Sequence, residues 1–151
     1  PLYEQLELLK KNKVAVVCGI LSGTLASLTG IFVLCMLFGF NHKQYVTMLP
    51  KSITTAIGIG ISEELGGIVT ITVAVIIITG ILGNVIADTV FHIFKIKNPL
   101  AKGLALGTAS HAIGTARAIE MGPVEGAMSS LAVAVAGLLT VVFVSGFAQL
   151  I

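Results

Sequence analysis

Three long runs of the sequence carry no charged side chain, and they constrain the fold more than any other feature. The runs cover residues 14–40, 65–87 and 126–151. A helix needs about 20 apolar residues to cross the hydrocarbon core of a bilayer, so each run is long enough. The middle run extends to residue 94 if Asp88 and His92 lie at the membrane boundary. We therefore predict three transmembrane helices.

The composition supports a membrane protein and argues against other classes. Of the 151 residues, 56% are hydrophobic and only 11% are charged, whereas a soluble domain of this length needs far more surface charge. The 17 glycines are typical of membrane helices, in which small residues allow backbones to approach closely. The formal charge of +2, with no Lys/Arg cluster that forms a basic face, does not indicate nucleic-acid binding. We expect an all-α polytopic integral membrane protein with one membrane domain over residues 1–151.

Several further classes find no support in the sequence. No set of His, Cys and Glu has metal-site spacing, and no nucleophile–base motif or phosphate-binding glycine loop occurs. We therefore expect neither an enzyme nor a bound metal or cofactor. The chain opens with Pro1 and lacks the pattern of a signal peptide, so we expect it to begin inside a longer protein.

Two shorter segments are more polar than the three runs and look like interrupted helices. One is MLPKSITTAIGIGISEELGG, residues 48–67, where Pro50 fits the first turn of a helix. The other is GLALGTASHAIGTARAIEMG, residues 103–122, introduced by the loop signal Asn98-Pro99 and closed by Gly122-Pro123. Two interrupted polar segments in one membrane chain predict a transporter site near the midplane of the bilayer.

The lysines predict how the chain crosses the membrane. One cluster precedes the first run and another follows the second, namely Lys10, Lys11 and Lys13, and Lys95, Lys97 and Lys102. Placing both clusters in the cytoplasm obeys the positive-inside rule. Residues 50–64 must then enter and leave on the same face. We prefer this re-entrant version; the alternative is a full crossing.

Residues 103–118, if helical throughout, form one polar face. At about 100° per residue, an arc of about 120° holds six side chains and is flanked by Thr108 and Thr115; the six are Gly103, Gly107, Ser110, His111, Gly114 and Arg117. The glycines alone are explained by close helix packing. Ionisable groups are expensive in lipid and usually mark a cavity, a partner or a transport path. We therefore favour a binding site over packing alone.

The candidate residues follow from these two segments. The substrate-binding candidates are Lys51, Ser52, Thr54, Thr55, Thr108, Ser110, His111 and Arg117, with Lys51 and Arg117 holding an anion. The first candidate for proton coupling is His111, because imidazole titrates near neutral pH, and Glu120 and Glu125 are further candidates. The helix-packing candidates are Gly103, Gly107 and Gly114.

Two stretches also resemble a known family. NPLAKGLALGTASHAIGTARAIEMGPVEGAMSSLAVAVAGLL looks like the C-terminal signature of the LrgB/CidB family of bacterial membrane proteins, and LPKSITTAIGIGISEELGG resembles an earlier one. The opening PLYEQLELLKK is similar too, so the resemblance covers essentially the whole chain. One departure is Ala56, where many members have proline after the paired threonines.

The resemblance implies a multi-pass protein of the bacterial inner membrane, with two described roles. The older description is antiholin-like: together with a small holin-like partner of the LrgA/CidA type, such proteins modulate murein hydrolase activity and cell lysis. A related plant chloroplast protein carries glycolate and glycerate, and bacterial members have been linked to pyruvate-type monocarboxylates. With the polar segments, this favours a transporter of small monocarboxylates (pyruvate, lactate or glycolate), with proton coupling as an option. An antiholin-like subunit is the alternative, and homo-oligomerisation stays open.

Overall fold

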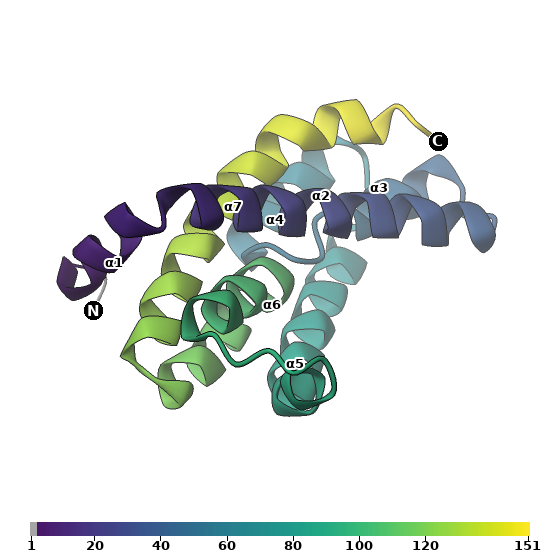
Figure 1. Cartoon of the computed structure of the whole chain (residues 1–151). Coiled ribbons are helices and arrows are strands. Elements are labelled where there is room, and N and C mark those ends of the chain that lie inside the picture. Colours follow the sequence, from purple (N-terminus) through teal and green to yellow (C-terminus); the bar gives the residue numbers. More distant parts are fainter. Residues whose placement is uncertain (1–2) are drawn as a thin grey trace.

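Helices account for every regular element in the part of the chain that the structure describes. The computed structural model describes residues 3–151. Its elements are η1 (Tyr3–Gln5), α1 (Leu6–Lys11), α2 (Lys13–Leu37), α3 (His42–Met48), α4 (Thr55–Glu64), α5 (Val69–Ile93), α6 (Pro99–Met121) and α7 (Pro123–Ala148). Figure 1 shows α2, α5 and α7 as the long helices, with α6 enclosed between them.

The three long helices are the predicted transmembrane spans. They contain 25, 25 and 26 residues and are apolar enough to cross a membrane. At about 1.5 Å per residue, each is longer than the roughly 30 Å hydrocarbon core. Large apolar side chains such as Leu37, Val85 and Val142 are at least 70% exposed, which suits helices that face lipid. Because α5 continues to Ile93, Asp88 and His92 lie near its end, as the boundary argument required.

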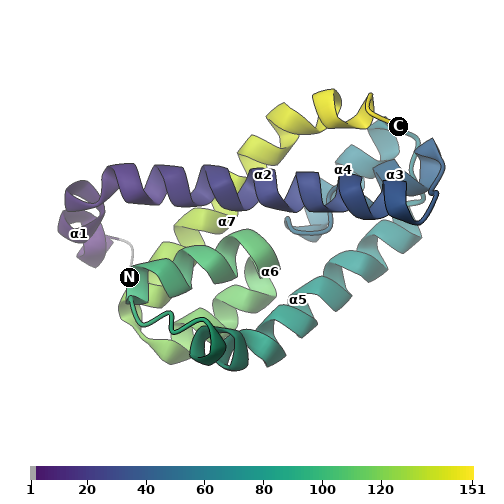
Figure 2. The same cartoon turned by 45° about the vertical axis from the view of Figure 1, so that its right-hand side comes forward.

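The chain between α2 and α5 forms a re-entrant segment. Helix α3 leads inward from the end of α2, and α4 leads back to the start of α5 (Figure 2). The Ile68 amide donates to Thr47 Oγ1 at 2.8 Å, and Thr72 Oγ1 donates to the Thr47 carbonyl at 2.9 Å. Residues 47 and 68 therefore lie side by side, and the chain between them enters and leaves on one face. The structure adopts the re-entrant version.

Pro50 does not begin a helix, so that prediction was wrong. Helix α3 ends at Met48 and α4 begins at Thr55. The intervening residues form successive tight turns, with hydrogen bonds from the Lys51 amide to the Met48 carbonyl and from the Ile53 amide to the Pro50 carbonyl. The residue before α4, Thr54, has extended backbone (φ −64°, ψ 146°) and makes no side-chain capping bond.

Helix α6 starts and ends where the sequence predicted. Asn98 caps it by accepting hydrogen bonds from the amides of Leu100 and Ala101, Pro99 occupies its first turn, and Gly122 follows its last residue. These are the signals expected at a helix start, where the proline ring costs nothing because its missing amide has no helical partner.

Helix α6 is broken at His111, which has φ 42° and ψ −136°. We call residues 99–110 its first arm and residues 112–121 its second arm. The His111 ring bonds to the Ile76 carbonyl, whereas Lys102 on the first arm lies over the Phe91 ring and Arg117 on the second arm pairs with Asp88. Asp88 and Phe91 come after Ile76 on α5, at a distance of about 18–22 Å along the helix axis. Both arms therefore start and end near one end of α5, and α6 is also re-entrant.

The break overturns the predicted single polar face of residues 103–118. That prediction required a continuous helix, in which each residue advances the side chain by about 100°. The positive φ of His111 reverses the chain instead, so Gly103 and Gly107 on the first arm no longer share a face with Arg117 on the second arm.

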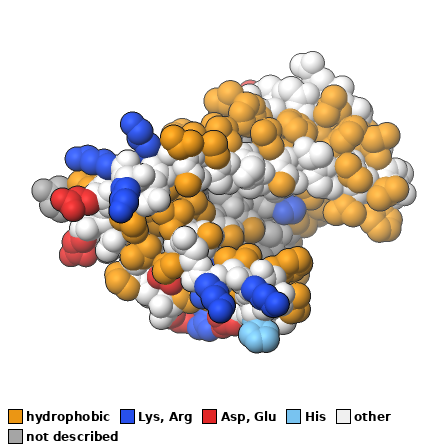
Figure 3. Space-filling view, in the orientation of Figure 1, with side chains coloured by type: hydrophobic (Ala, Val, Ile, Leu, Met, Phe, Trp, Pro, Cys, Tyr) orange, Lys and Arg blue, Asp and Glu red, His pale blue; other side chains and the backbone are white. Residues whose placement is uncertain are grey.

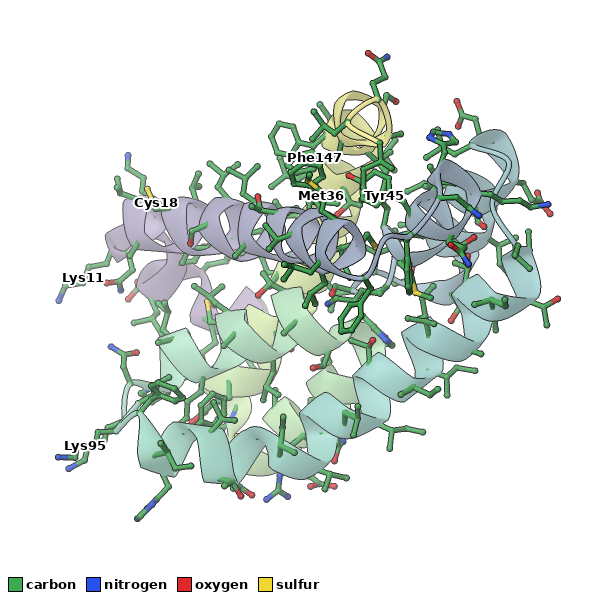
Figure 4. All side chains as sticks on the ribbon, turned by 90° about the vertical axis from the view of Figure 1, so that its right-hand side faces the viewer. Lys11, Cys18, Met36, Tyr45, Lys95 and Phe147 are labelled. Atoms are coloured by element: carbon green, nitrogen blue, oxygen red, sulfur yellow. The ribbon has the colours of Figure 1, made fainter. Side chains whose placement is uncertain are left out.

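The two re-entrant segments enter from opposite ends of the molecule. Figure 4 shows Lys11 and Lys95 at one end, while Tyr45 and Phe147 lie away from it, where the α3–α4 segment begins. The Tyr45 hydroxyl donates to the Phe147 carbonyl at 2.9 Å, which joins α3 to the end of α7. The lysine clusters before α2 and after α5 thus share an end, as the positive-inside argument predicted.

Glycines allow α6 to pack closely on α7. A Cβ atom built on Gly103 would lie 2.4 Å from the Glu125 carbonyl oxygen, and one on Gly107 would lie 2.4 Å from the Ser129 carbonyl oxygen. Gly114 serves the break, because a Cβ there would lie 2.6 Å from Ser110 Cβ and 2.9 Å from the Leu106 carbonyl oxygen. All three predicted packing glycines stand at close approaches of this kind.

We expect Gly107→Ala to destabilise the protein by about 1–3 kcal/mol, because the added methyl group would overlap the α7 backbone. Gly30→Ala is the matched control, since a Cβ on this α2 glycine meets nothing within 4 Å. Thermal unfolding in detergent would measure both. Equal melting temperatures for the two variants would contradict the close α6–α7 contact.

The re-entrant topology predicts which positions share a membrane face. In a background without Cys18 and Cys35, Lys11→Cys and Lys95→Cys should react with a membrane-impermeant thiol reagent from the same face. His42→Cys should react from the opposite face. His42 Nδ1 lies 2.7 Å from the Ile151 carbonyl oxygen, beyond the end of α7, and this end of the molecule lies away from Lys11 and Lys95. Labelling of positions 11 and 95 from opposite faces would instead mean that residues 50–64 cross the membrane fully.

Candidate functional site

A groove of about 830 Å³ lies between α2 and the first arm of α6. Figure 3 shows a hollow below α2 with basic side-chain atoms at its floor. Small side chains make the groove wide, among them Gly19 and Ala26 on α2 and Ala101 and Ala105 on α6. The helices come together at Gly23, where a Cβ would lie 2.8 Å from Thr108 Oγ1.

Lys51 is the charged side chain of this groove. It stands in the turn between α3 and α4, where no helix holds the backbone, and it is half-buried. Its Nζ donates to Ser52 Oγ at 2.7 Å and to Ser27 Oγ at 3.4 Å, and Ser27 Oγ donates to Ser52 Oγ at 2.9 Å. No carboxylate of the described residues forms an ion pair with Lys51. The groove therefore presents a cation whose partners are two neutral hydroxyls.

Thr108 brings the second re-entrant segment to the same place. Its buried hydroxyl donates to the Leu104 carbonyl at 2.8 Å within the first arm, and its side chain lines the groove together with Ser52. The inner ends of the two interrupted segments thus meet at the groove floor. The two polar segments therefore meet, as the sequence predicted.

An uncompensated ammonium in a low-dielectric site is unfavourable unless an anion joins it. Hydroxyls beside Lys51 add hydrogen-bond donors or acceptors without adding a competing negative charge. The arrangement suits the binding of a small anion and offers no nucleophile–base pair for covalent chemistry.

His111 lies at the break in α6 and faces α5. Its Nε2 is 2.9 Å from the Ile76 carbonyl oxygen, which fixes the proton of a neutral ring on Nε2. Gly80 makes room for the ring, because a Cβ there would lie 2.8 Å from His111 Cε1. The next turn is tied to the break by Thr115, whose hydroxyl donates to the His111 carbonyl at 2.9 Å. His111 is therefore a buried residue that holds the reversal of the chain.

The structure does not bring Arg117 to Lys51. Arg117 bonds to Glu120 at 2.7 Å and forms a closer pair with Asp88 near the end of α5. The two carboxylates are 61% and 65% exposed, so this cluster lies at the surface of the protein. Asp88 lies about 18 Å along α5 from Ile76. The side chain of Ile76 packs near Gly58 and Pro50, so the Arg117 cluster is far from the turn that contains Lys51.

The remaining candidates divide between the groove and other surroundings. Ser110 is buried against α5, where a Cβ on Gly83 would overlap its hydroxyl. Thr54 and Thr55 begin α4 and are not among the groove-lining residues. Glu125 lies in the first turn of α7, next to Gly122. Of the predicted substrate-binding set, Lys51, Ser52 and Thr108 line the groove.

Ser27, which accepts a hydrogen bond from Lys51, is a groove residue that the sequence reasoning missed. It lies in an uncharged transmembrane run, where a lone serine attracts no attention. A signal was nevertheless present, because small residues recur at helical spacing along α2, at positions 15, 19, 22, 23, 26 and 27. Such a stripe can indicate a wall that does not face lipid.

These features define a class of protein: a polytopic α-helical membrane protein in which two re-entrant segments meet at an open groove that contains a lysine. The chain belongs to the LrgB-like family, whose model matches residues 1–150. It is 40% identical to "Antiholin-like protein LrgB" of Bacillus subtilis (strain 168) over 100% of this chain and 65% of the relative.

Further relatives carry the same name. The proteins of Bacillus cereus (strain B4264) and Bacillus anthracis (strain CDC 684 / NRRL 3495) are each 42% identical to this chain, over 97% of it and 64% of their own length. The chain thus spans slightly less than two thirds of these relatives. No solved structure matches it significantly.

The environment of Lys51 predicts an unusual response to its removal. Lys51→Met keeps the length of the side chain and removes a charge that no carboxylate balances, so we expect a higher melting temperature in detergent. Lys102→Met, which removes a half-buried lysine charge outside the groove, is the matched control and should change stability little. A clear loss of stability in Lys51→Met would show that Lys51 is needed for folding rather than held for a ligand.

Proposed function

We propose that the groove binds a small monocarboxylate of the pyruvate, lactate or glycolate class, and that the protein carries this anion across the bacterial inner membrane. The observation that carries the proposal is the half-buried Lys51, which has hydroxyl partners but no counter-charge where the two re-entrant segments meet. A carboxylate supplies the missing charge and two hydrogen-bond acceptors.

Each groove residue has a role in this proposal. Lys51 holds the carboxylate, and Ser27, Ser52 and Thr108 contribute hydroxyl groups to the lining. The small side chains of Ala26 on α2 and of Ala101 and Ala105 on α6 leave room for the ligand. Arg117 has a different role from the one expected from the sequence: its two ion-pair partners favour a contribution to holding α6 against α5.

His111 remains the first candidate for proton coupling. It lies one turn after Thr108 and occupies the inner end of α6, so a positive charge gained there would fall close to the groove. Because Nε2 faces the Ile76 carbonyl, the proton would enter on Nδ1. Glu120 is engaged by Arg117, and Glu125 lies at the start of α7, which makes both weaker candidates.

The alternative is an antiholin-like subunit that assembles with a holin-like membrane protein of the LrgA/CidA type and so influences murein hydrolase activity. The printed names of the relatives favour it. Under this proposal the glycine-lined face of α2 is a packing surface for the partner helix, and the charge of Lys51 is secondary.

Uptake of labelled pyruvate, lactate and glycolate into proteoliposomes that contain the full-length parent protein tests the transport proposal. We expect saturable uptake that Lys51→Met lowers about 10–100-fold, since a hydrogen-bonded charge is lost. Arg117→Gln is the matched control: it also removes a positive charge, but outside the groove, and should retain most of the uptake. A pH gradient across the vesicle membrane would test proton coupling.

Two results would contradict this proposal. Equal uptake by the wild-type protein and Lys51→Met would remove Lys51 from the site. Flux no greater than that of empty liposomes, from protein shown to be folded, would favour the antiholin-like subunit. That alternative predicts that bulky substitutions at Gly19 abolish co-purification with the holin-like partner, while Lys51→Met has no effect on it.

A further inference from the structure

A second and much smaller cavity adjoins the groove. Its volume is about 10 Å³, which is the lower end of the space that one water-sized oxygen needs. Ser27, Ser52 and Thr108 line both spaces, so these three side chains stand between the groove and the small cavity. Thr24 on α2 and Thr140 on α7 belong to the small cavity alone.

Thr24 is the exceptional residue of this cavity. Its side chain is buried, and Thr24 Oγ1 is the one buried side-chain oxygen or nitrogen of the described residues that has no hydrogen-bond partner. Buried polar groups are nearly always paired, so an orphan of this kind needs an explanation. A helical threonine commonly donates to the carbonyl four residues before it, yet Thr24 does not.

The neighbouring hydroxyls leave the hydrogen-bonding capacity that a guest oxygen needs. Thr108 and Thr140 donate their protons to the carbonyls of Leu104 and Ala136, so their oxygens are free to accept. Ser52 Oγ accepts from both Lys51 and Ser27, which leaves its own proton free to donate. With Thr24, the cavity offers donors and acceptors on three elements and at the re-entrant turn.

The positive charge of Lys51 limits which chemical group the small cavity can hold. Its Nζ lies 2.7 Å from Ser52 Oγ, which lines the cavity, so a metal cation there would be repelled. A neutral oxygen is compatible with the charge. Because Ser27, Ser52 and Thr108 line both the groove and the small cavity, this oxygen can belong to the anion that Lys51 holds.

We propose that Thr24 is a specificity-determining residue, and that the small cavity receives the oxygen substituent on the carbon next to the carboxylate, a 2-hydroxyl or 2-oxo group. This inference rests on the proposed transport of monocarboxylates. The carboxylate lies against Lys51 in the groove, and the neighbouring oxygen lies among Ser52, Thr24 and Thr108. The site then selects 2-oxygenated acids over unsubstituted acids of the same length.

Paired substrates test this inference in the full-length parent protein. Uptake into proteoliposomes is measured for glycolate against acetate and for lactate against propionate, in wild-type protein, Thr24→Val and Thr24→Ser. We expect the wild-type protein to prefer the oxygenated member of each pair, and Thr24→Val to lower that ratio about tenfold, since one hydrogen bond is lost. Thr24→Ser retains the hydroxyl and should keep the ratio. Thr79→Val, which removes a hydroxyl from α5 outside both cavities, is the matched control.

The outcomes separate this inference from the proposed function. Uptake of all four acids with the same ratio in wild-type and Thr24→Val protein would overturn the role of Thr24 and leave transport standing. Absence of uptake of any acid by folded wild-type protein would overturn both. If Thr24→Val fails to fold, Thr24→Ala provides the same comparison, and an unchanged ratio there would equally overturn the proposal.

Discussion

The reversal of the chain at His111 is the constraint on which the rest of the structure depends. A residue other than glycine is unfavourable at φ 42°, so its surroundings must hold it there. The ring bonds to the Ile76 carbonyl, and Thr115 bonds to the carbonyl of His111 itself. Gly80 and Gly114 provide the space. These contacts fold one 23-residue helix into two arms inside the membrane layer.

Other features of the site follow from that reversal. The first arm stops at the depth of Ile76, which leaves Thr108 beside the turn that carries Lys51. The second arm returns to the end of α5, where Arg117 finds two carboxylates. Arg117 and Lys51, which the sequence predicted to bind the same anion, therefore lie in different surroundings. One is compensated at the surface, and the other remains without a counter-charge in a groove.

Much of the fold could be predicted from the sequence, because the bilayer imposes simple rules. Uncharged length predicted the three spans, Asn98-Pro99 and Gly122 predicted the bounds of α6, and the lysine clusters predicted the re-entrant path of residues 50–64. An interruption of this segment was expected, but its position at His111 escaped prediction because histidine rarely adopts positive φ and neither glycine nor proline occupies that position. Its cause lies in contacts with α5, which are distant in sequence.

The candidate site could be predicted in part for the same reason. Lys51, Ser52 and Thr108 were found because polar residues are conspicuous in apolar surroundings. Arg117 was included because a continuous helix would have placed it on their face. Ser27 and Thr24 were missed because hydroxyls are common in transmembrane helices and only the packing of α2 against α6 shows which of them meet a cavity.

The opposite entry of the two re-entrant segments has a mechanical consequence. Each follows a 25-residue helix, α2 or α5, and these helices run in opposite directions (Figure 2). Ser52 and Thr108 are therefore carried by segments that enter from opposite ends of the molecule, although both line the same small cavity. The small cavity is thus bounded by two chain segments whose attachments lie at opposite ends of the molecule, so a shift of one segment need not move the other.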